Sequence, residues 1–515
     1  ESALHLACRA GNVAATKMLL EAGCSVRTSL GNGGTPLHCA CQAGCAEIVR
    51  LLIDKGAVID APRTGAAVKA ITPLHDAAES GCTEAAIALI EAGANVDALQ
   101  SSLMTPLHVA SKHGNKDVVS LLLKHGASFK RTCIDTRGAD ARCIHLAAEH
   151  NHCDVVDVLV QAGADLSSCR EYLGQRGVTC LHLAVTKQHE EMTQCLIRKG
   201  HEAHPVDMDG LSPLHLAARA GLSVITAALL HAGANVNAGA ASSQSAQQTP
   251  LHFAARYKHR KTAELLLQRG ADVNTSESMP CTDKEASVGY TALHWAAENG
   301  DTEMVLLLLS FNADVNRQAS FENHSGVTPL HLAAQDGHTD VVRELLKLES
   351  CARDPRKRTC ARENITPLHQ AVYNGHRSTA EALLEAGADV NLQADNGYAA
   401  VHYAAQTGDV PMTSLLLQHG ANANLSACGR NQRDVRPLHL AVQSANTKVV
   451  KLLVEAGAEL NASKTMGGVE GVTALHQAVY QEKEDVVSAL VELKCDVNEA
   501  MLGWYSALHI AAERG

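Results

Sequence analysis

Histidine recurs at one spacing in this sequence, and imidazole is both a common metal ligand and the usual acid–base group near neutral pH. The residues Thr-Pro-Leu-His stand at 35–38 and return at 72–75, 105–108, 249–252, 328–331 and 366–369. Fifteen of the 28 histidines occupy the last position of this motif or of a variant of it. A histidine held in place by a motif is a candidate for metal binding or for catalysis.

Two short stretches also have the composition of metal sites. Their candidate ligands are Cys143, His145, His150, His152 and Cys153 in one stretch, and Cys39, Cys41 and Cys45 in the other. Neither has the Cys-x₂-Cys spacing of tetrahedral zinc sites. Both His145 and His152 fall where other copies of the motif also place histidine. We therefore predict no metal site and no cofactor.

The histidines belong to an internal repeat that spans the whole chain. Five of the gaps between them are 33 residues, seven are 37, and one each is 38 and 42. The second residue after each histidine is alanine in all fifteen copies. A period of this size predicts a stacked-repeat architecture. The expected repeats begin near residues 2, 35, 72, 105, 142, 179, 212, 249, 291, 328, 366, 399, 436, 473 and 506 in one continuous array over 1–515.

Each repeat contains the signals of two short helices. Thr35 is a predicted helix N-cap and Pro36 stands at the first helical position, where its missing N–H is not needed. The first helix should end near Gly44 and the second, with an apolar stripe, should begin near Glu47. Gly56 is the expected left-handed residue after the second helix. The rest of each repeat predicts a turn or a hairpin, called the finger below.

The position of the histidine within the first helix favours a structural role. Counted from Thr35, His38 is the third helical residue, from which a side chain can reach back to the N-cap. A neutral imidazole there can accept a hydrogen bond from the N-cap and donate one to a neighbouring turn. We therefore predict structural braces, not catalytic groups, at His38, His75, His108, His215, His252, His331 and His369.

The pattern TPLHLAA…G…VVxLLLxxGADVN resembles the ankyrin repeat over the whole chain, with about fourteen full repeats and one half repeat. The resemblance implies an all-α fold, an ankyrin-repeat α-solenoid with projecting β-hairpin or loop fingers. It also implies protein binding without catalysis. Asparagines of the ADVN and ANVN turns resemble sites of asparaginyl hydroxylation, and those that fit are Asn237, Asn274, Asn316, Asn391 and Asn498. A simpler role for them is to hold the turn through side-chain bonds to backbone.

Departures from the repeat carry information. Asn312, Glu349 and Lys494 replace the glycine that follows the second helix. Because Glu and Lys adopt a left-handed backbone poorly, we expect the helices before Glu349 and Lys494 to end differently. The extra residues of the longer repeats fall in the fingers, which predicts either extended binding loops or neutral variation at a tolerant site.

One finger, 350–363, is strongly basic in an otherwise acidic chain. It is a candidate contact for an acidic or phosphorylated partner, or alternatively a solvated loop, through Arg353, Arg356, Lys357, Arg358 and Arg362. A weaker basic finger, 129–142, carries Lys130, Arg131, Arg137 and Arg142.

Composition narrows the function further. The net charge of −11 argues against nucleic acid, and aromatic residues make up only 3% of the chain. Seventeen cysteines without disulfide spacing indicate a reducing compartment, the cytoplasm or the nucleus. No apolar run is long enough for a membrane helix. The chain starts at a helix N-cap and stops after a first helix, so we expect a segment of a longer polypeptide or an incomplete gene prediction, with fast amide exchange after about Met501.

These observations predict a monomeric, non-catalytic scaffold or adaptor. Other proteins or extended peptides would bind its concave groove and its fingers, with basic partners weakly favoured by the net charge. Two alternatives remain open. The array is either the substrate-recognition arm of an enzyme system, such as a ubiquitin-ligase receptor or a kinase-linked protein, or the cytoplasmic domain of a membrane channel.

Overall fold

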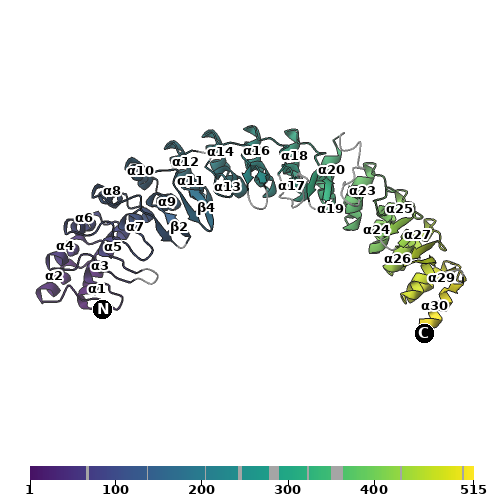
Figure 1. Ribbon diagram of the computed structural model, residues 1–515, viewed down its shortest axis with the longest axis horizontal. Coiled ribbons are helices and arrows are strands. Elements are labelled where there is room, and N and C mark those ends of the chain that lie inside the picture. The colour runs from purple at the N-terminus through teal and green to yellow at the C-terminus, as the bar shows by residue number, and fades with distance from the viewer. Residues whose placement is uncertain are drawn as a thin grey trace. The chain divides into compact units, whose positions relative to one another are not determined.

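The computed structural model describes residues 1–64, 69–135, 137–202, 205–241, 246–277, 289–321, 324–348, 364–429, 432–501 and 504–514. It divides into two compact units, Glu1–Ser243 and Gln244–Gly515, here called the N-terminal and the C-terminal unit. Each unit is a stack of helix pairs (Figure 1). Within each unit the first helices form one layer and the second helices form the other.

In the N-terminal unit, the first helices are α1 Ala3–Arg9, α3 Pro36–Gln42, α5 Pro73–Ser80, α7 Pro106–His113, α9 Cys143–Glu149, α11 Cys180–Thr186 and α13 Pro213–Ala220. The second helices are α2 Val13–Glu21, α4 Ala46–Asp54, α6 Thr83–Glu91, α8 Lys116–Lys124, α10 Cys153–Gln161, α12 Glu190–Arg198 and α14 Ser223–His231.

In the C-terminal unit, the first helices are α15 Pro250–Arg256, α17 Ala292–Glu298, α19 Pro329–Gln335, α22 Pro367–Tyr373, α24 Ala400–Thr407, α26 Pro437–Gln443, α28 Ala474–Tyr480 and α30 Ala507–Arg514. The second helices are α16 Arg260–Gln268, α18 Thr302–Ser310, α20 Thr339–Leu346, α23 Arg377–Glu385, α25 Val410–Gln418, α27 Thr447–Glu455 and α29 Glu484–Glu492.

The helices are too short to be stable alone and depend on packing against their neighbours. Except in α30, the apolar residue before the motif histidine and the alanine two residues after it are buried between helices, as Leu37 and Ala40 are in α3. The second helix contributes a buried stripe, which in α4 is Ile48, Val49 and Leu52. Small alanines let the first helices pack closely, which explains how the chain builds a core with few aromatic rings.

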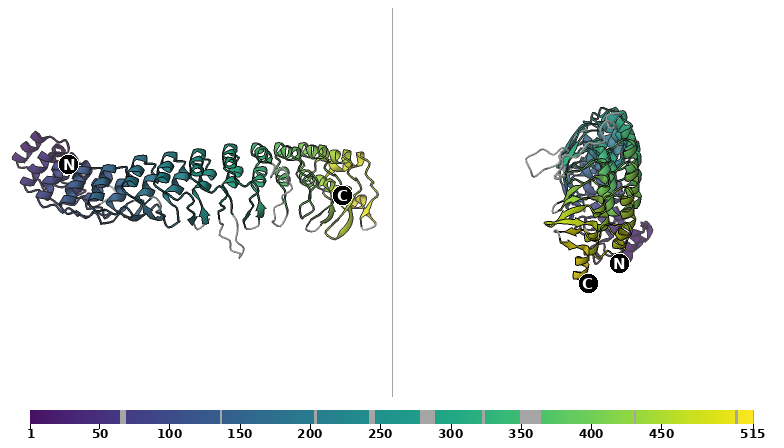
Figure 2. Two further views of the ribbon diagram at one scale, coloured as in Figure 1. Left: turned by 90° about the horizontal axis from the view of Figure 1, so that it is seen from above. Right: turned by 90° about the vertical axis from the view of Figure 1, so that its right-hand side faces the viewer.

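The fingers extend from the helices as turns or two-stranded hairpins (Figure 2). The strands are β1 Cys133–Asp135, β2 Gly138–Ala141, β3 Cys169–Tyr172, β4 Gln175–Thr179, β5 Ala240–Ala241, β6 Ala246–Gln248, β7 Ala319–Phe321, β8 His324–Val327, β9 Ala427–Gly429, β10 Gln432–Val435, β11 Ser463–Met466, β12 Val469–Thr473, β13 Ala500–Met501 and β14 Tyr505–Ser506. Antiparallel pairs β1–β2, β3–β4, β7–β8, β9–β10 and β11–β12 each contain a register shift typical of a bulge.

Neighbouring fingers also contact one another within each unit. In the C-terminal unit β9 to β12 form one four-stranded sheet, joined where Gln432 pairs with Met466. In the N-terminal unit the Leu173 N–H donates to the Arg137 carbonyl at 2.6 Å. Gly138 is required at this contact because a Cβ there would lie 2.1 Å from the Glu171 carbonyl oxygen. The fingers of adjacent repeats therefore support each other.

The second helices end as expected, with one correction. Asn312 has φ +62° and Lys494 has φ +66°, so both adopt the left-handed conformation that glycine adopts elsewhere. The prediction that the helix before Lys494 ends differently is wrong. Its end is held by Lys494 N–H donating to the Val491 carbonyl and by Cys495 N–H donating to the Leu490 carbonyl, and these bonds offset the local strain. Glu349 lies outside the described residues.

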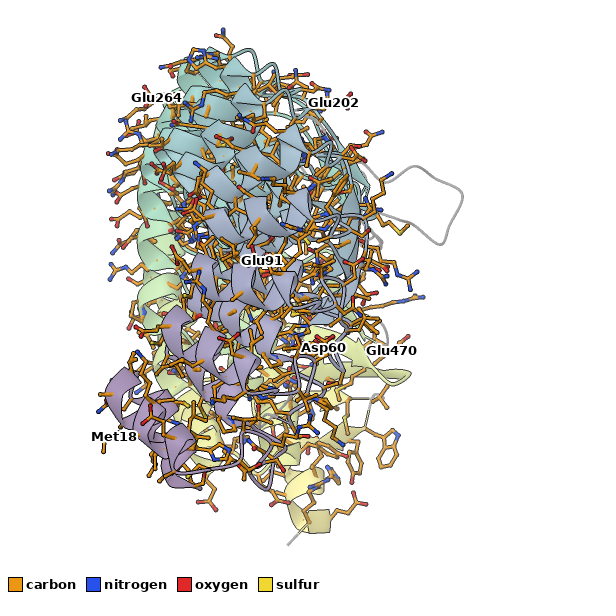
Figure 3. All side chains as sticks on the ribbon, turned by 90° about the vertical axis from the view of Figure 1, so that its left-hand side faces the viewer. Met18, Asp60, Glu91, Glu202, Glu264 and Glu470 are labelled. Carbon is orange, nitrogen blue, oxygen red and sulfur yellow. The ribbon has the colours of Figure 1, made fainter. Side chains whose placement is uncertain are left out.

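Exposed acidic side chains are spread over the surface, as Asp60, Glu91, Glu202, Glu264 and Glu470 illustrate (Figure 3). In the described part of the chain, no helix is both long enough and apolar enough to cross a membrane.

Candidate partner-binding surface

The motif histidines join the first helix of a repeat to the finger of the same repeat. The Thr35 N–H donates to His38 Nδ1 at 3.1 Å, and the Thr35 hydroxyl lies 2.9 Å from the same nitrogen. Because Nδ1 accepts, Nε2 carries the proton and donates to the carbonyl of Ile71, at the end of the same repeat's finger, at 3.1 Å. The N-cap N–H makes the same bond to Nδ1 at His75, His108, His215, His252, His331 and His369.

Burial keeps these rings neutral. Desolvation lowers the pKa of His38, His108 and His294 to about 4, against a weaker raising effect of the carbonyl each ring contacts. In these three rings both nitrogens are hydrogen-bonded within the protein, so neither is available to a metal or a substrate. The geometry is that of a brace between a first helix and its finger.

A second set of histidines joins each repeat to the preceding one. His152 stands at the N-cap of α10, and its Nε2 donates to the Lys112 carbonyl at 3.0 Å. His189 and His338 make the same contact with the carbonyls of Glu149 and Glu298. Sequence reasoning identified this as a repeat position but not its bonding partner, because the carbonyl lies about 40 residues earlier.

The candidate metal ligands are not assembled into a site. His145 Nε2 bonds the Ser168 carbonyl and His150 Nδ1 the Leu146 carbonyl. Burial raises the pKa of the Cys143 thiol, and it raises that of Cys153 to about 12. Within the described residues, no group of three or more His, Cys, Asp and Glu side chains is arranged to hold a metal ion.

A second prediction, that the turn asparagines hold their own turn through their side chains, is wrong for Asn391 and Asn274. Asn391 does not use its side chain to hold its own turn; its amide donates to the Gly420 carbonyl at 3.0 Å and accepts from the Asn422 N–H at 2.7 Å, both in the next repeat. Asn274 likewise bonds the Asn312 carbonyl and the Asp314 N–H. The turn itself is held by the residue two positions earlier, whose side chain accepts from the backbone N–H of Asn237, Asn274, Asn316, Asn391 and Asn498.

The fingers of the N-terminal unit are fixed by buried ion pairs. Glu149 lies at the end of α9 with its side chain 1% exposed, and it pairs with Arg137 and with Arg170. Arg170, whose side chain is fully buried, also donates to Asp135 at 2.9 Å. Burial alone would raise the pKa of Asp135, but hydrogen bonds from Arg170 and the backbone lower it overall. A smaller pair joins Arg63 to the buried Asp76 of α5.

The C-terminal unit uses aromatic rings for the same purpose. Tyr290 packs edge-on against Trp295 of α17 with ring centroids 5.0 Å apart. Tyr403 of α24 meets Tyr373 and Tyr398 at 5.7 and 5.4 Å. These rings stand between the finger and the first helix, so the finger is seated on the helix face.

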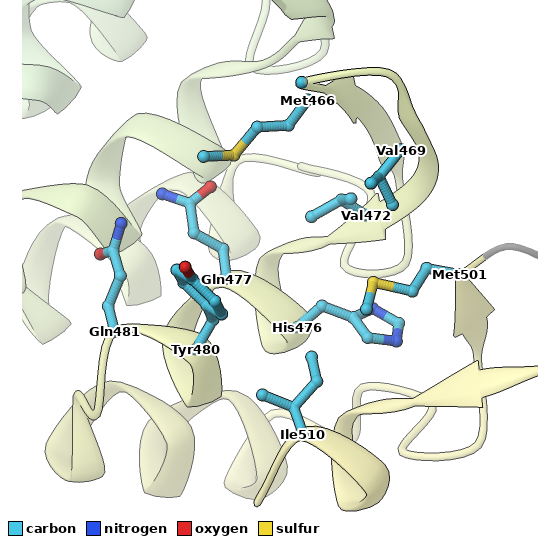
Figure 4. Close-up of a pocket in the computed structure, with 10 residues that line it drawn as sticks. Met466, Val469, Val472, His476, Gln477, Tyr480, Gln481, Met501 and Ile510 are labelled. Carbon is cyan, nitrogen blue, oxygen red and sulfur yellow. The ribbon is translucent and has the colours of Figure 1, made fainter. Parts of the chain in front are cut away.

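A pocket of about 280 Å³ opens between a finger and two first helices of this unit (Figure 4). Its apolar walls are Met466, Val469, Val472, Met501 and Ile510. The polar residues at its margin are His476, Gln477, Tyr480 and Gln481, all from α28 or the residue after it. This pocket was not predicted, because its walls come from three different repeats.

The two basic fingers that were candidate partner contacts differ in how much of each the structure describes. Arg353, Arg356, Lys357, Arg358 and Arg362 lie outside the described residues. In the weaker basic finger, Arg131 pairs with Asp97 and Arg137 with Glu149, so part of the positive charge is neutralised within the chain.

Comparison with known proteins agrees with this architecture. A family model described as ankyrin repeats (3 copies) matches residues 1–63, 62–133, 144–240, 239–319, 293–394 and 368–464. A second model, ankyrin repeats (many copies), matches 438–491. The chain belongs to the ankyrin-repeat family. Ankyrin repeats generally act as protein–protein interaction modules.

No curated protein matches the chain. Among solved structures, the human ASB11 ankyrin repeat domain is similar at 26% identity with a TM-score of 0.40, over 45% of this chain and 98% of that domain.

Proposed function

We propose that this ankyrin array is a non-catalytic scaffold or adaptor that binds partner proteins on the surface formed by its first helices and fingers. The observation that carries the proposal is the bonding between repeats. Histidines at the start of second helices and turn asparagines connect neighbouring repeats through backbone groups, and ion pairs or rings seat the fingers. A surface held in this way loses little conformational freedom on binding, which favours affinity.

The same surface would serve two alternatives: the substrate-recognition arm of an enzyme system and the cytoplasmic domain of a membrane channel. Either would use the array to bind protein, and sequence beyond residues 1–515 would distinguish them. The basic finger at 350–363 remains a proposed contact for an acidic or phosphorylated segment. A monomeric array in the cytoplasm or nucleus, and hydroxylation of the five turn asparagines, also remain proposals.

The test is partner capture with variants whose first-helix charge is altered. Arg219→Glu and Gln406→Lys change exposed side chains on first helices, one in each unit. Arg50→Ala and Lys448→Ala change exposed side chains on second helices and serve as controls. Proteins captured from a cell lysate by the wild type and identified by mass spectrometry should be lost with a first-helix variant and retained with both controls. Equal capture by all four variants would contradict the proposed binding face.

A further inference from the structure

In four successive first helices of the C-terminal unit, three repeat positions hold only uncharged side chains, and nine of the twelve are partly or fully exposed. Facing positions lie one, four and five residues after each motif histidine. In α22, α24, α26 and α28 these are Gln370, Tyr373, Asn374, Tyr403, Gln406, Thr407, Leu440, Gln443, Ser444, Gln477, Tyr480 and Gln481, here called the amide–tyrosine strip. None of these side chains carries a charge, although the same positions in the N-terminal unit include Arg9, Glu79 and Lys112.

The strip is continuous from one repeat to the next. Tyr373 and Tyr403 are in edge-to-face contact across the first step. The Ser444 hydroxyl donates to the Ala405 carbonyl at 3.1 Å across the second. Across the third, Gln477 Nε2 donates to the His439 carbonyl at 3.0 Å. The exposed rings of Tyr373 (59%) and Tyr480 (54%) stand near its two ends, and the Arg514 guanidinium lies over one side of the Tyr480 ring, 4.1 Å from its centroid.

The pocket lies at the α28 end of the strip and holds an unused hydrogen-bond acceptor. Gln477 is 4% exposed and lines the pocket. Its Nε2 is committed to the His439 carbonyl, and within the described structure its Oε1 has no hydrogen-bond partner. A buried polar atom without a partner is unfavourable, so a ligand N–H that reaches Oε1 would gain the missing bond (Figure 4).

The chemistry of the strip matches an uncharged peptide backbone. Glutamine and asparagine side chains carry the same donor and acceptor groups as a peptide bond. Tyrosine rings pack well against proline, and aromatic-lined grooves are a recurring means of recognising polyproline II segments. That conformation has no internal hydrogen bonds, so its backbone groups are free to meet side-chain amides.

The spacing also favours this conformation. Packed helices lie about 8–10 Å apart, and one three-residue turn of polyproline II advances about 9.3 Å. Every third residue would therefore face the same position of the next first helix. A β-strand advances by a similar distance in three residues, but its side chains alternate between faces and would not keep register. Four helices would accommodate about ten residues.

We propose that the amide–tyrosine strip binds an uncharged, proline-rich segment of a partner protein in the polyproline II conformation, with an apolar side chain in the pocket beside Gln477. The inference rests on the proposed function and specifies the class of partner for this part of the surface.

The probe is a C-amidated (Pro-Leu-Ser)₄ peptide with fluorescein coupled to its N-terminus in place of the free amine, and its binding to the full chain is measured by fluorescence anisotropy. Two matched peptides are (Gly-Leu-Ser)₄, which lacks the preformed conformation, and (Pro-Leu-Lys)₄, which is charged. We expect the proline peptide to bind at least about tenfold more tightly than the glycine peptide. Its affinity should be almost unchanged between 50 and 500 mM salt, about the range over which screening removes surface charge effects.

Variants locate the site. Tyr480→Ala and Gln443→Ala should each weaken binding by about fivefold or more, as loss of a well-packed interface contact does. Lys448→Ala, on the second helix of the same repeat as Gln443, should leave it unchanged, and circular dichroism checks that all variants are folded. Equal binding of the proline and glycine peptides, tighter salt-sensitive binding of the charged peptide, or self-association of the chain that Tyr480→Ala abolishes would each overturn the inference.

The experiments distinguish failure of the proposed binding face from failure of the proposed partner class. If lysate proteins still depend on the first-helix face while the proline peptide does not bind, the partner class is wrong and the binding face stands. If neither depends on that face, the proposed function fails as well.

Discussion

Fingers of the N-terminal unit are held to their first helices by buried charge, whereas those of the C-terminal unit are held by aromatic rings. Of the 14 aromatic residues in the chain, only Phe129 and Tyr172 precede residue 244. The Glu149–Arg170–Asp135 network of one unit has its counterpart in the Tyr373–Tyr403–Tyr398 cluster of the other. The same repeat can therefore hold its finger either by ion pairs or by aromatic rings, because the finger contacts the first helix at positions that do not belong to the core between the helices.

The largest expected effect is a loss of stability at acidic pH, which both units should share because both contain buried motif histidines. Burial lowers the pKa of His145 and His182 in one unit and of His402 in the other to about 4, while the unfolded value is about 6.5. The unfolded chain therefore binds more protons between these values, so stability is full above pH 6.5 and falls as the pH decreases toward 4. Each such histidine should cost about 2 kcal/mol at pH 5.

Hydrogen exchange at pH 7.5 and at pH 5, corrected for the intrinsic exchange rate, checks this. Both units should lose protection to a similar extent, because the brace recurs in both. Loss in one unit alone would show that the braces are not equivalent.

Disrupting the ion-pair network around Glu149 should destabilise the N-terminal unit and leave the stability of the C-terminal unit unchanged. Glu149→Ala leaves Arg170 buried without one of its partners, and the expected loss is about 3–5 kcal/mol. Hydrogen exchange should report it over 133–179 with the C-terminal unit unaffected. Glu79→Ala is the matched control, because Glu79 holds the same repeat position in α5 but is exposed, and it should change stability by less than about 0.5 kcal/mol.

The reciprocal experiment removes a ring. Tyr403→Ala deletes a side chain that is 9% exposed and contacts three rings, so we expect a loss of about 3 kcal/mol confined to the C-terminal unit. Tyr403→Phe keeps the rings and loses only the hydroxyl that accepts from Asn396, which should cost about 1 kcal/mol or less. Urea unfolding followed by circular dichroism measures both. Equal losses in the two variants would assign the effect to the hydroxyl and not to the ring cluster.

The smallest effect concerns the ends of the second helices, where the N-terminal unit uses glycine throughout and the C-terminal unit does not. Lys494→Gly should stabilise by about 1 kcal/mol because φ is +66°. The converse Gly126→Ala, at φ +85°, should destabilise by a similar amount. Thermal unfolding of the two variants tests whether the difference between units is one of backbone strain. A stabilising Gly126→Ala would contradict that view.

Local signals in the sequence predicted much of the fold. Thr35, Pro36 and His38 define a helix start through contacts within four residues, and Gly56 marks a helix end through its own backbone freedom. The period of the motif predicted how many such units to expect and that they stack. The role of His38 as a brace followed from its place in the helix alone.

Contacts with the fingers and between repeats could not be predicted in the same way, because they join residues about 20 to 40 positions apart. Nothing near Glu149 in the chain distinguishes it from the exposed Glu79, and only the hairpins that bring Arg137 and Arg170 against α9 bury it. The hydrogen bonds of Asn391 to the turn of the next repeat have the same origin. The sequence by itself determined the repeat, its helices and its braces, since these depend on local hydrogen bonding. Only the tertiary structure decided which finger is seated by charge, which by rings, and where an uncharged strip and its pocket are left open, since those depend on which side chains distant repeats bring together.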